Sequence, residues 1–340
     1  MSRREHVYVI GAGFSRDLGY PLTNSLLVDV WDRLNINTKK RLENVIRFHH
    51  PAFYITRKTT FPNIEQLLTE IAVNEEMFDA SRPTEGNFRK AELSELKEIL
   101  LSEIALWFHE IYEDARTAKW LSEFRNRLRE ENAAIISFNW DLLLDHLLFN
   151  EASLDAHSYG LANQLGRGPI LIKPHGSLNW YGASEVSKVK ADKRILIFPH
   201  EKEEERIEAF LYPRSITSKV GRRYTPLIVP PAYVKDFRRP IFRRLWQRCT
   251  DLLSTPQKLY FLGYSLPAAD LQVQFILRCG FHNQLEGRLR KGGRRTKPTG
   301  PAEVYIVNPD QEAARRIESV AGPRFSCHWI NQRVEKWIFN

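Results

Sequence analysis

The chain has 340 residues and a mass of 39.8 kDa, which is enough for one large domain with insertions or for two domains. Hydrophobic residues make up 43% of the sequence and charged residues 27%, a balance typical of a globular protein and not of a disordered chain. The formal net charge of +9 is compatible with a nucleotide, a nucleic acid or an acidic protein as partner, and charge alone does not choose among them.

Targeting signals and cysteine chemistry are also restricted by the sequence. The longest apolar runs are far shorter than the ~20 residues that a membrane span needs. Arg3 and Arg4 precede an apolar run too short for a signal peptide, so we expect a cytoplasmic protein. The three cysteines are far apart and form no CxxC pair, so we expect neither a structural zinc site nor disulfides.

The beginning of the chain predicts a strand, a glycine turn and a helix. Residues 7–10 are β-branched or aromatic, and they are followed by Gly11-Ala12-Gly13 and by a helical pattern over about residues 22–34. In this arrangement backbone N–H groups and a helix N-terminus face an anionic ligand, and the two glycines would let the backbone approach a pyrophosphate. Ser15 would add a hydroxyl donor. Arg16 stands where the dinucleotide-binding fingerprint has its third glycine, so an ordinary strand-to-helix turn remains the alternative.

Residues 51–130 are expected to form a helical insertion. Asn63 has the position of an N-cap, with Gln66 three residues later. Apolar residues then recur every three or four positions from 93 to 111, which indicates one amphipathic helix face. No strand pattern occurs in this block, although strand patterns precede and follow it.

Further buried strands are predicted at residues 133–137, 169–172, 226–230, 259–262 and 304–307. Polar segments follow four of them: FNWD at 138–141, KPHGS at 173–177, GYSLP at 263–267 and NPD at 308–310. In an open parallel sheet, ligands bind outside the carboxyl ends of the strands. We therefore expect an α/β protein with a Rossmann-like parallel sheet flanked by helices and a site at one sheet edge. Residues 181–225 are polar and read as a charged surface insertion.

The segments GAGFS, FNWD, KPHGS, GYSLP and VNPD, in this order, resemble the sirtuin family, specifically its divergent bacterial members encoded in antiviral defence systems. The resemblance implies a core made of residues 1–50, 131–180 and 226–340, with NAD bound in its cleft as substrate. It implies that the cofactor is held by Gly11, Ala12, Gly13, Phe14, Ser15, Gly263, Ser265 and Asn308. It also implies that Asn139 and Asp141 face the nicotinamide ribose and that His175 is the general base.

Two departures from the family pattern bear on the expected reaction. The four zinc cysteines of the family's deacylases are absent, and Leu22-Thr23 stands where the family has a Phe-Arg pair. We therefore expect NAD hydrolysis, as in members that deplete NAD during phage infection, and neither zinc nor protein deacylation. ADP-ribosyl transfer is one alternative. Non-catalytic binding of nucleic acid or a protein is another, favoured by arginines on a predicted helix at 237–253 and by a basic loop at 288–297. Taken singly, Asn139 could be a helix N-cap and His175 a loop residue.

Control of such an activity is expected to come from assembly. The resemblance implies a homo-oligomer or a separately encoded partner such as a ring-forming ATPase. The aromatic residues Trp107, Phe108, Tyr112 and Trp120 of the helical insertion are the expected contact surface.

Overall fold

A computed structural model describes the main part of the chain. The described residues are 4–77, 88–150, 154–162, 165–182, 195–199, 204–210, 226–229, 239–268, 270–290 and 292–339. The charged segment expected at 181–225 therefore lies largely outside the described residues. Within them, no helix is both long and apolar enough to cross a membrane.

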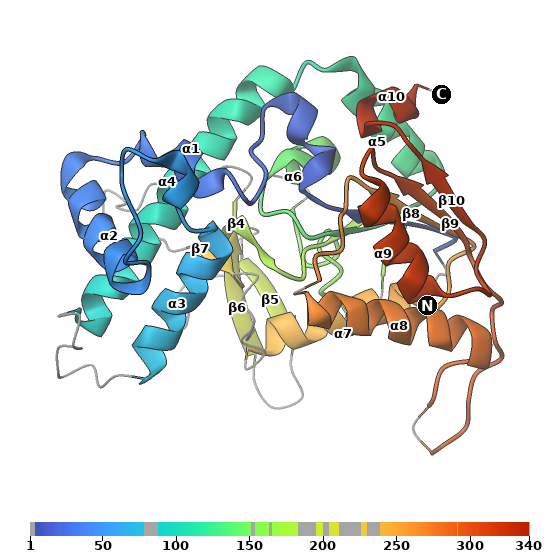
Figure 1. Ribbon diagram of the computed structural model, residues 1–340. Helices are drawn as coiled ribbons and strands as arrows, with labels where there is room; N and C mark the ends of the chain where they lie inside the picture. Colours follow the sequence, from blue (N-terminus) through green and yellow to red (C-terminus); the bar gives the residue numbers. More distant parts are fainter. Residues whose placement is uncertain are drawn as a thin grey trace.

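The centre of the molecule is a six-stranded sheet in which all neighbouring strands are parallel (Figure 1). Its order is β10 (Cys327–Ile330), β9 (Glu303–Val307), β8 (Lys258–Leu262), β1 (His6–Ile10), β2 (Ala134–Ser137) and β3 (Ile170–Ile172). Val7 to Ile10 are buried, as expected of a central strand that is covered on both faces. The predicted α/β fold class is confirmed.

Helices cover both faces of this sheet. α7 (Pro240–Leu253) and α8 (Leu271–Glu286) lie below it in Figure 1, and α5 (Lys119–Glu130) and α10 (Val334–Ile338) lie above it. α9 (Gln311–Ala321) packs on α8, and α6 (Leu143–Leu148) packs on α5. From β1 the chain builds β2 and β3 on one side and later β8 to β10 on the other, so a topological switch point lies between β1 and β8.

The helix predicted over about residues 22–34 is shorter in the structure. The glycine turn is followed by two 3₁₀ turns, Ala12–Phe14 and Arg16–Leu18, and the helix α1 spans only Leu26–Trp31. Gly19, at φ +92°, and Pro21 interrupt the segment between them. No long helix therefore begins at the glycine turn, and a helix N-terminus is not part of its chemistry.

A second hydrophobic core lies beside the sheet. It is formed by α1, α2 (Ile36–His49), α3 (Ile64–Met77) and α4 (Lys90–Ala115), drawn in blue to teal in Figure 1. Trp140 and Leu178 join it from the sheet side. Of the four aromatic residues expected at a contact surface here, Phe108 and Trp120 are buried in the hydrophobic cores, whereas Trp107 and Tyr112 are partly exposed. The contact surface itself stays a prediction.

A smaller antiparallel sheet was not predicted. Its order is β5 (Ile195–Pro199), β6 (Glu204–Ala209), β4 (Gly176–Gly182) and β7 (Pro226–Ile228). The strand predicted at 226–230 thus belongs to this sheet and not to the parallel one. β4 continues directly from the segment after β3, so the small sheet ends close to the carboxyl edge of the large one.

Candidate functional site

Two glycine-containing loops, residues 11–15 after β1 and residues 263–267 after β8, are in close contact at the switch point, and we call them the interlocked glycine loops. Gly13 N donates to Gly263 O at 2.9 Å, and Gly263 has φ +58°, a conformation that favours glycine. A Cβ on Gly263 would lie 2.3 Å from the carbonyl carbon of Gly13, and a Cβ on Gly11 would lie 2.8 Å from the Cα of Tyr264. The absence of side chains on Gly11 and Gly13 therefore allows the loop after β8 to approach closely. The approach of their backbone to a pyrophosphate stays a prediction.

A cavity of about 760 Å³ opens at the carboxyl ends of β1, β2, β8 and β9. This volume lies within the ~300–1,000 Å³ range of small-molecule and cofactor sites. Its lining includes ten of the residues expected at the site: Gly11, Ala12, Gly13, Ser15, Asn139, Asp141, His175, Gly263, Ser265 and Asn308. The topology thus brings together residues up to 297 positions apart in the chain.

Phe14 is the expected cofactor-binding residue that does not line the cavity. Its side chain is buried, and its ring centroid lies 5.3 Å from that of Trp120 and 5.2 Å from that of Phe124, both on α5. Phe14 therefore anchors the glycine loop to the hydrophobic core.

The side-chain amide of Asn139 is held by hydrogen bonds of its nitrogen, Nδ2. Its Nδ2 donates to Gly11 O at 3.0 Å and lies 3.5 Å from Ser15 Oγ, so the amide nitrogen faces the glycine loop. In the part of the chain that the structure describes, its Oδ1 accepts no hydrogen bond. This oxygen is thus a fixed, available acceptor in the cavity wall.

Asp141, which follows Asn139 by two residues, is buried beside Ser15. Ser15 Oγ donates to its Oδ2 at 3.1 Å, and the backbone N–H of Leu143 donates to its Oδ1 at 3.1 Å. Asp141, and not Asn139, thus accepts from the N–H of the first residue of α6, whose N-cap position is held by Leu142. Burial raises the pKa of Asp141, and the neighbouring ammonium of Lys173 opposes that shift. Since the Ser15 hydroxyl hydrogen points to this carboxylate, it is not available to a phosphate in this arrangement.

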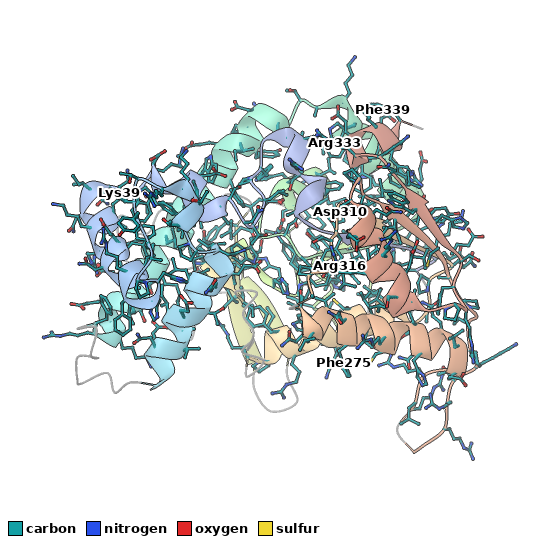
Figure 2. The ribbon with its side chains drawn as sticks, viewed as in Figure 1. Lys39, Phe275, Asp310, Arg316, Arg333 and Phe339 are labelled. Atoms are coloured by element: carbon teal, nitrogen blue, oxygen red, sulfur yellow. The ribbon has the colours of Figure 1, made fainter. Side chains whose placement is uncertain are left out.

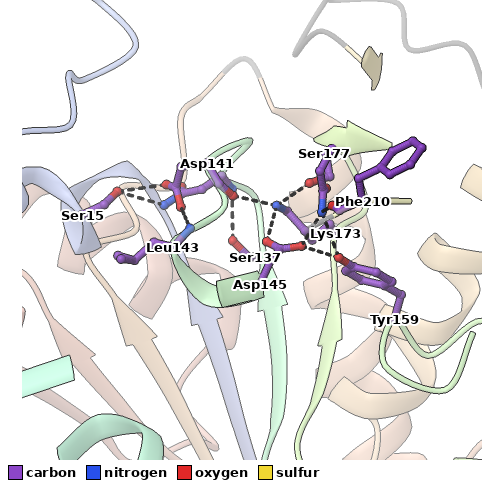
Figure 3. Close-up of polar contacts among 11 residues, drawn as sticks. Ser15, Ser137, Asp141, Leu143, Asp145, Tyr159, Lys173, Ser177 and Phe210 are labelled. Carbon is purple, nitrogen blue, oxygen red and sulfur yellow. Dashed lines mark hydrogen bonds and ion pairs between the residues drawn. The ribbon is translucent and has the colours of Figure 1, made fainter. Parts of the chain in front are cut away.

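A buried polar network supports Asp141 from behind (Figure 3). Lys173 Nζ donates to Asp141 O at 2.7 Å, to Asp145 Oδ2 at 2.9 Å and to Ser177 Oγ at 2.6 Å. The side chains of Lys173 and Asp145 are 1% and 0% exposed. Tyr159 donates to Asp145 Oδ1 at 2.5 Å, and Asn179 Nδ2 donates to Phe210 O at 2.6 Å. This network fixes α6, β3 and β4 relative to one another.

His175 lies at the turn from β3 into β4. It is 3% exposed, and its ring centroid lies 5.1 Å from that of Phe138 and 5.7 Å from that of Trp246. Its carbonyl accepts from Val229 N at 2.8 Å, which ties the turn to the small sheet. The imidazole therefore has a restrained orientation within an aromatic surround at the cavity wall.

Asn308 and Ser265 line the cavity but also hold the backbone. Asn308 Nδ2 donates to Tyr264 O at 3.2 Å, and its Oδ1 accepts from Asp310 N at 2.9 Å. The carbonyl of Ser265 accepts from Arg316 Nε at 2.9 Å. Both residues thus join the loop after β8 to the loop after β9 and to α9.

Several lining residues were not predicted from the sequence. α3 and the residue before it contribute Asn63, Glu65, Gln66 and Thr69, and the C-terminal region contributes Arg316 and Arg333. Figure 2 shows Asp310, Arg316 and Arg333 along the same side of the molecule. Arg333 Nη1 lies 2.6 Å from Asp17 Oδ1, and Arg316 Nη2 lies 3.7 Å from Asp310 Oδ2. Arg16, next to the glycine loop, forms no ion pair with the described residues.

Among the described residues, no group of three or more His, Cys, Asp or Glu side chains is arranged to hold a metal ion. The three cysteines are free thiols, and burial raises the pKa of Cys249 and Cys327.

Comparisons with known proteins give the following. No protein-family model matches the sequence, and no curated protein matches it either. Among solved structures, a mutant Sir2 homologue in complex with ADP-ribose is 13% identical in sequence to this chain. The alignment covers 98% of this chain and 88% of the homologue, with a TM-score of 0.46. Another mutant Sir2 homologue, in complex with 2′-O-acetyl ADP-ribose, is 13% identical with the same coverages and a TM-score of 0.42. A Sir2 complex with the inhibitor EX-527 is 14% identical, with coverages of 99% and 91% and a TM-score of 0.38.

Proposed function

We propose that the protein binds NAD in this cavity and hydrolyses the bond between nicotinamide and ribose. The observation that carries the proposal is the placement of Asn139, Asp141 and His175 around one cavity beside the interlocked glycine loops. Depletion of cellular NAD during phage infection is the physiological role that the sequence resemblance implies within this proposal.

The reaction makes specific demands on such a site. The bond from the ribose C1′ to the nicotinamide nitrogen breaks, and its electron pair neutralises the pyridinium ring. A water oxygen forms the new bond to C1′, and the products are nicotinamide, ADP-ribose and one proton. Because positive charge develops on the ribose, fixed dipoles and buried negative charge near C1′ stabilise the transition state.

Each of the three residues meets one of these demands. The free Oδ1 of Asn139 would accept a hydrogen from the attacking water, because its Nδ2 is held by Gly11 O at 3.0 Å. The carboxyl group of Asp141, fixed by Ser15 and Leu143, would face the ribose. The imidazole of His175 would accept a proton from a ribose hydroxyl, the task for which histidine is suited near neutral pH.

The remaining lining supports a dinucleotide. Arg16 is exposed next to the glycine loop, where a diphosphate would meet a guanidinium that forms no ion pair within the described part of the chain. Ser265 and Asn308 lie on the far side of the switch point, at the loops after β8 and β9. NAD would then lie across the switch point, as dinucleotides do in doubly wound sheets.

The test is direct measurement of nicotinamide release from NAD by liquid chromatography. We expect Asn139→Ala and His175→Ala to lower the rate by about 10²–10⁴-fold. Asn37→Ala and His157→Ala, which change the same residue types at exposed positions outside the cavity, should leave the rate unchanged. Full activity in a folded Asn139→Ala or His175→Ala protein contradicts the assigned roles. Binding of NAD by the wild type without nicotinamide release contradicts the hydrolase and supports the non-catalytic alternative.

A further inference from the structure

The net charge of the chain is concentrated in one segment. Residues 239–300 contain twelve Lys and Arg residues against three Asp and Glu residues, a formal charge of +9. The rest of the chain contains 38 of each sign and is therefore neutral. Nine of the twelve cations are arginines, the side chain whose planar fork matches a phosphate group.

Nine of these cations belong to described residues of three neighbouring elements: α7, α8 and the segment 287–297 (Figure 1). We call the surface of these elements the basic surface. Arg288 Nη1 lies 2.6 Å from Asp251 Oδ1 on α7, and Arg295 Nη1 lies 3.4 Å from His282 Nε2 on α8. A Cβ on Gly280 would lie 2.5 Å from the Cβ of Leu253, so the two helices are in close contact. These contacts fix the three elements relative to one another.

Many of the cations are not engaged within the described part of the fold. Arg243, Arg278, Arg290, Arg294 and Lys297 are exposed, and their side chains form no hydrogen bond or ion pair with the described residues. The basic surface therefore presents positive charge that this part of the fold does not use.

A hollow of about 480 Å³ lies between α7 and the start of the segment 287–297. Its lining includes Arg244, Arg248 and Arg288 around the carboxylate of Asp251. Arg248 is 2% exposed, and its guanidinium is held by Gly160 O at 3.1 Å and Ala162 O at 2.8 Å. The hollow is thus a fixed, concave and positively charged part of the basic surface.

We propose that the basic surface binds the phosphate backbone of a nucleic acid. An acidic protein is the other class of partner that the charge allows. Protein interfaces are built around an apolar centre with a charged rim. Here the exposed apolar side chains are divided between two elements: Leu271 and Phe275, each 66% exposed, lie in the first half of α8, and Leu289, 60% exposed, lies in the segment 287–297. Figure 2 shows Phe275 on α8. Phe275 lies three residues before the exposed Arg278 on α8, and an exposed aromatic ring beside a cation fits a strand whose bases stack and whose phosphates repeat.

The basic surface is separate from the NAD cavity. The segment 287–297 leads into the amino end of β9, whereas the cavity lies at the carboxyl ends of the strands. α8 runs between them: Asp270, its N-cap, lines the cavity, and the segment 287–297 follows its C-terminus. Its 16 residues span about 24 Å at 1.5 Å per residue. The segment 287–297 therefore lies at the opposite end of α8 from the cavity, and this proposal does not depend on NAD hydrolysis.

The experiment is fluorescence anisotropy with a labelled DNA of about 30 nucleotides, single-stranded in one arm and duplex in the other, between about 50 and 200 mM salt. The test variant combines Arg290→Gln, Arg294→Gln and Lys297→Gln. The control combines Lys40→Gln, Lys58→Gln and Lys119→Gln, which are exposed lysines without a partner among the described residues and which remove the same charge. Circular dichroism verifies that both variants are folded.

We expect the test variant to bind at least about tenfold more weakly. The salt slope should fall by about 2 to 3, because each phosphate that the variant no longer neutralises reduces the slope by ~0.7–0.9. The control should bind within about twofold of the wild type, and nicotinamide release should be unchanged in both variants. Equal loss of binding in the control, or an unchanged salt slope in the test variant, would overturn the proposal. Displacement of the DNA by polyglutamate at equal charge would overturn it in favour of an acidic protein. The DNA that the wild type binds more tightly, single-stranded or duplex, identifies the form of nucleic acid that the basic surface prefers.

Discussion

Replacement of Lys173 by methionine tests whether the buried network holds the site together. Methionine has a similar length but removes the hydrogen bonds to Asp141 O, Asp145 Oδ2 and Ser177 Oγ. It leaves the carboxylate of Asp145, which is 0% exposed, without its cation. Breaking a buried ion pair by removing one partner costs about 3–5 kcal/mol. The hydroxyl of Tyr159 still donates to Asp145, so we expect a loss near the lower limit, about 3 kcal/mol.

Urea denaturation measures this loss, with the fluorescence of the eight tryptophans as the signal. The double variant Lys173→Met/Asp145→Asn should recover more than about 1 kcal/mol of it, because the charge of Asp145 no longer stays buried without its cation. Lys119→Met, at an exposed position without a partner among the described residues, should change the free energy of unfolding by less than about 0.5 kcal/mol. A Lys173→Met protein as stable as the wild type, or a double variant with simply additive losses, would refute the reasoning.

Two further predictions concern acid stability and the interlocked loops. Burial, the largest cause, lowers the pKa of His146 to about 4. The folded protein therefore binds fewer protons than the unfolded chain between about pH 6.5 and 4, and stability falls on acidification through this window. His146→Gln should reduce this loss of the free energy of unfolding by about 3 kcal/mol, as measured by urea titrations at several pH values. If His157→Gln had the same effect, His146 would not be the cause of the loss. Gly263→Ala should lower the free energy of unfolding by more than about 3 kcal/mol, because the new Cβ would lie 2.3 Å from Phe14 N. Gly293→Ala, also at positive φ but with nothing within 4 Å, should cost about 1 kcal/mol, and equal losses at the two glycines would exclude the interlock as the cause.

The sequence predicts the central strands well for a physical reason. β1, β2 and β8 are covered on both faces, so their burial appears as continuous apolar runs. β10 is an edge strand that is only partly buried, and its residues Cys327 to Ile330 show no such run. β4 contains two buried polar residues: Ser177, whose Oγ accepts from Lys173 Nζ, and Asn179, whose Nδ2 donates to Phe210 O. Hydropathy gives no signal for polar residues buried in this way.

The site is only partly readable from the sequence. Asn139 and His175 follow predicted strands, and the rule that ligands bind at the carboxyl edge places them together. Arg333 and Gln66 reach the same cavity because α10 and α3 pack beside it, and that packing is a tertiary event without a local pattern. The roles of Ser15 and Asn308 in holding their neighbours depend on hydrogen bonds across the switch point, which spacing does not show.

The cavity wall formed by α3 packs in the second hydrophobic core, whereas the interlocked glycine loops pack in the core of the central sheet. α3 and the residue before it bring polar side chains to the cavity, yet the buried residues of α3, such as Leu67 and Leu68, pack in the second core. The glycine loops, by contrast, stand on strands of the central sheet. The site is therefore modular: substitutions on the polar side of α3 reshape the wall without disturbing the packing that stabilises the sheet. The residues that shape this wall and the residues that stabilise the sheet are consequently different ones.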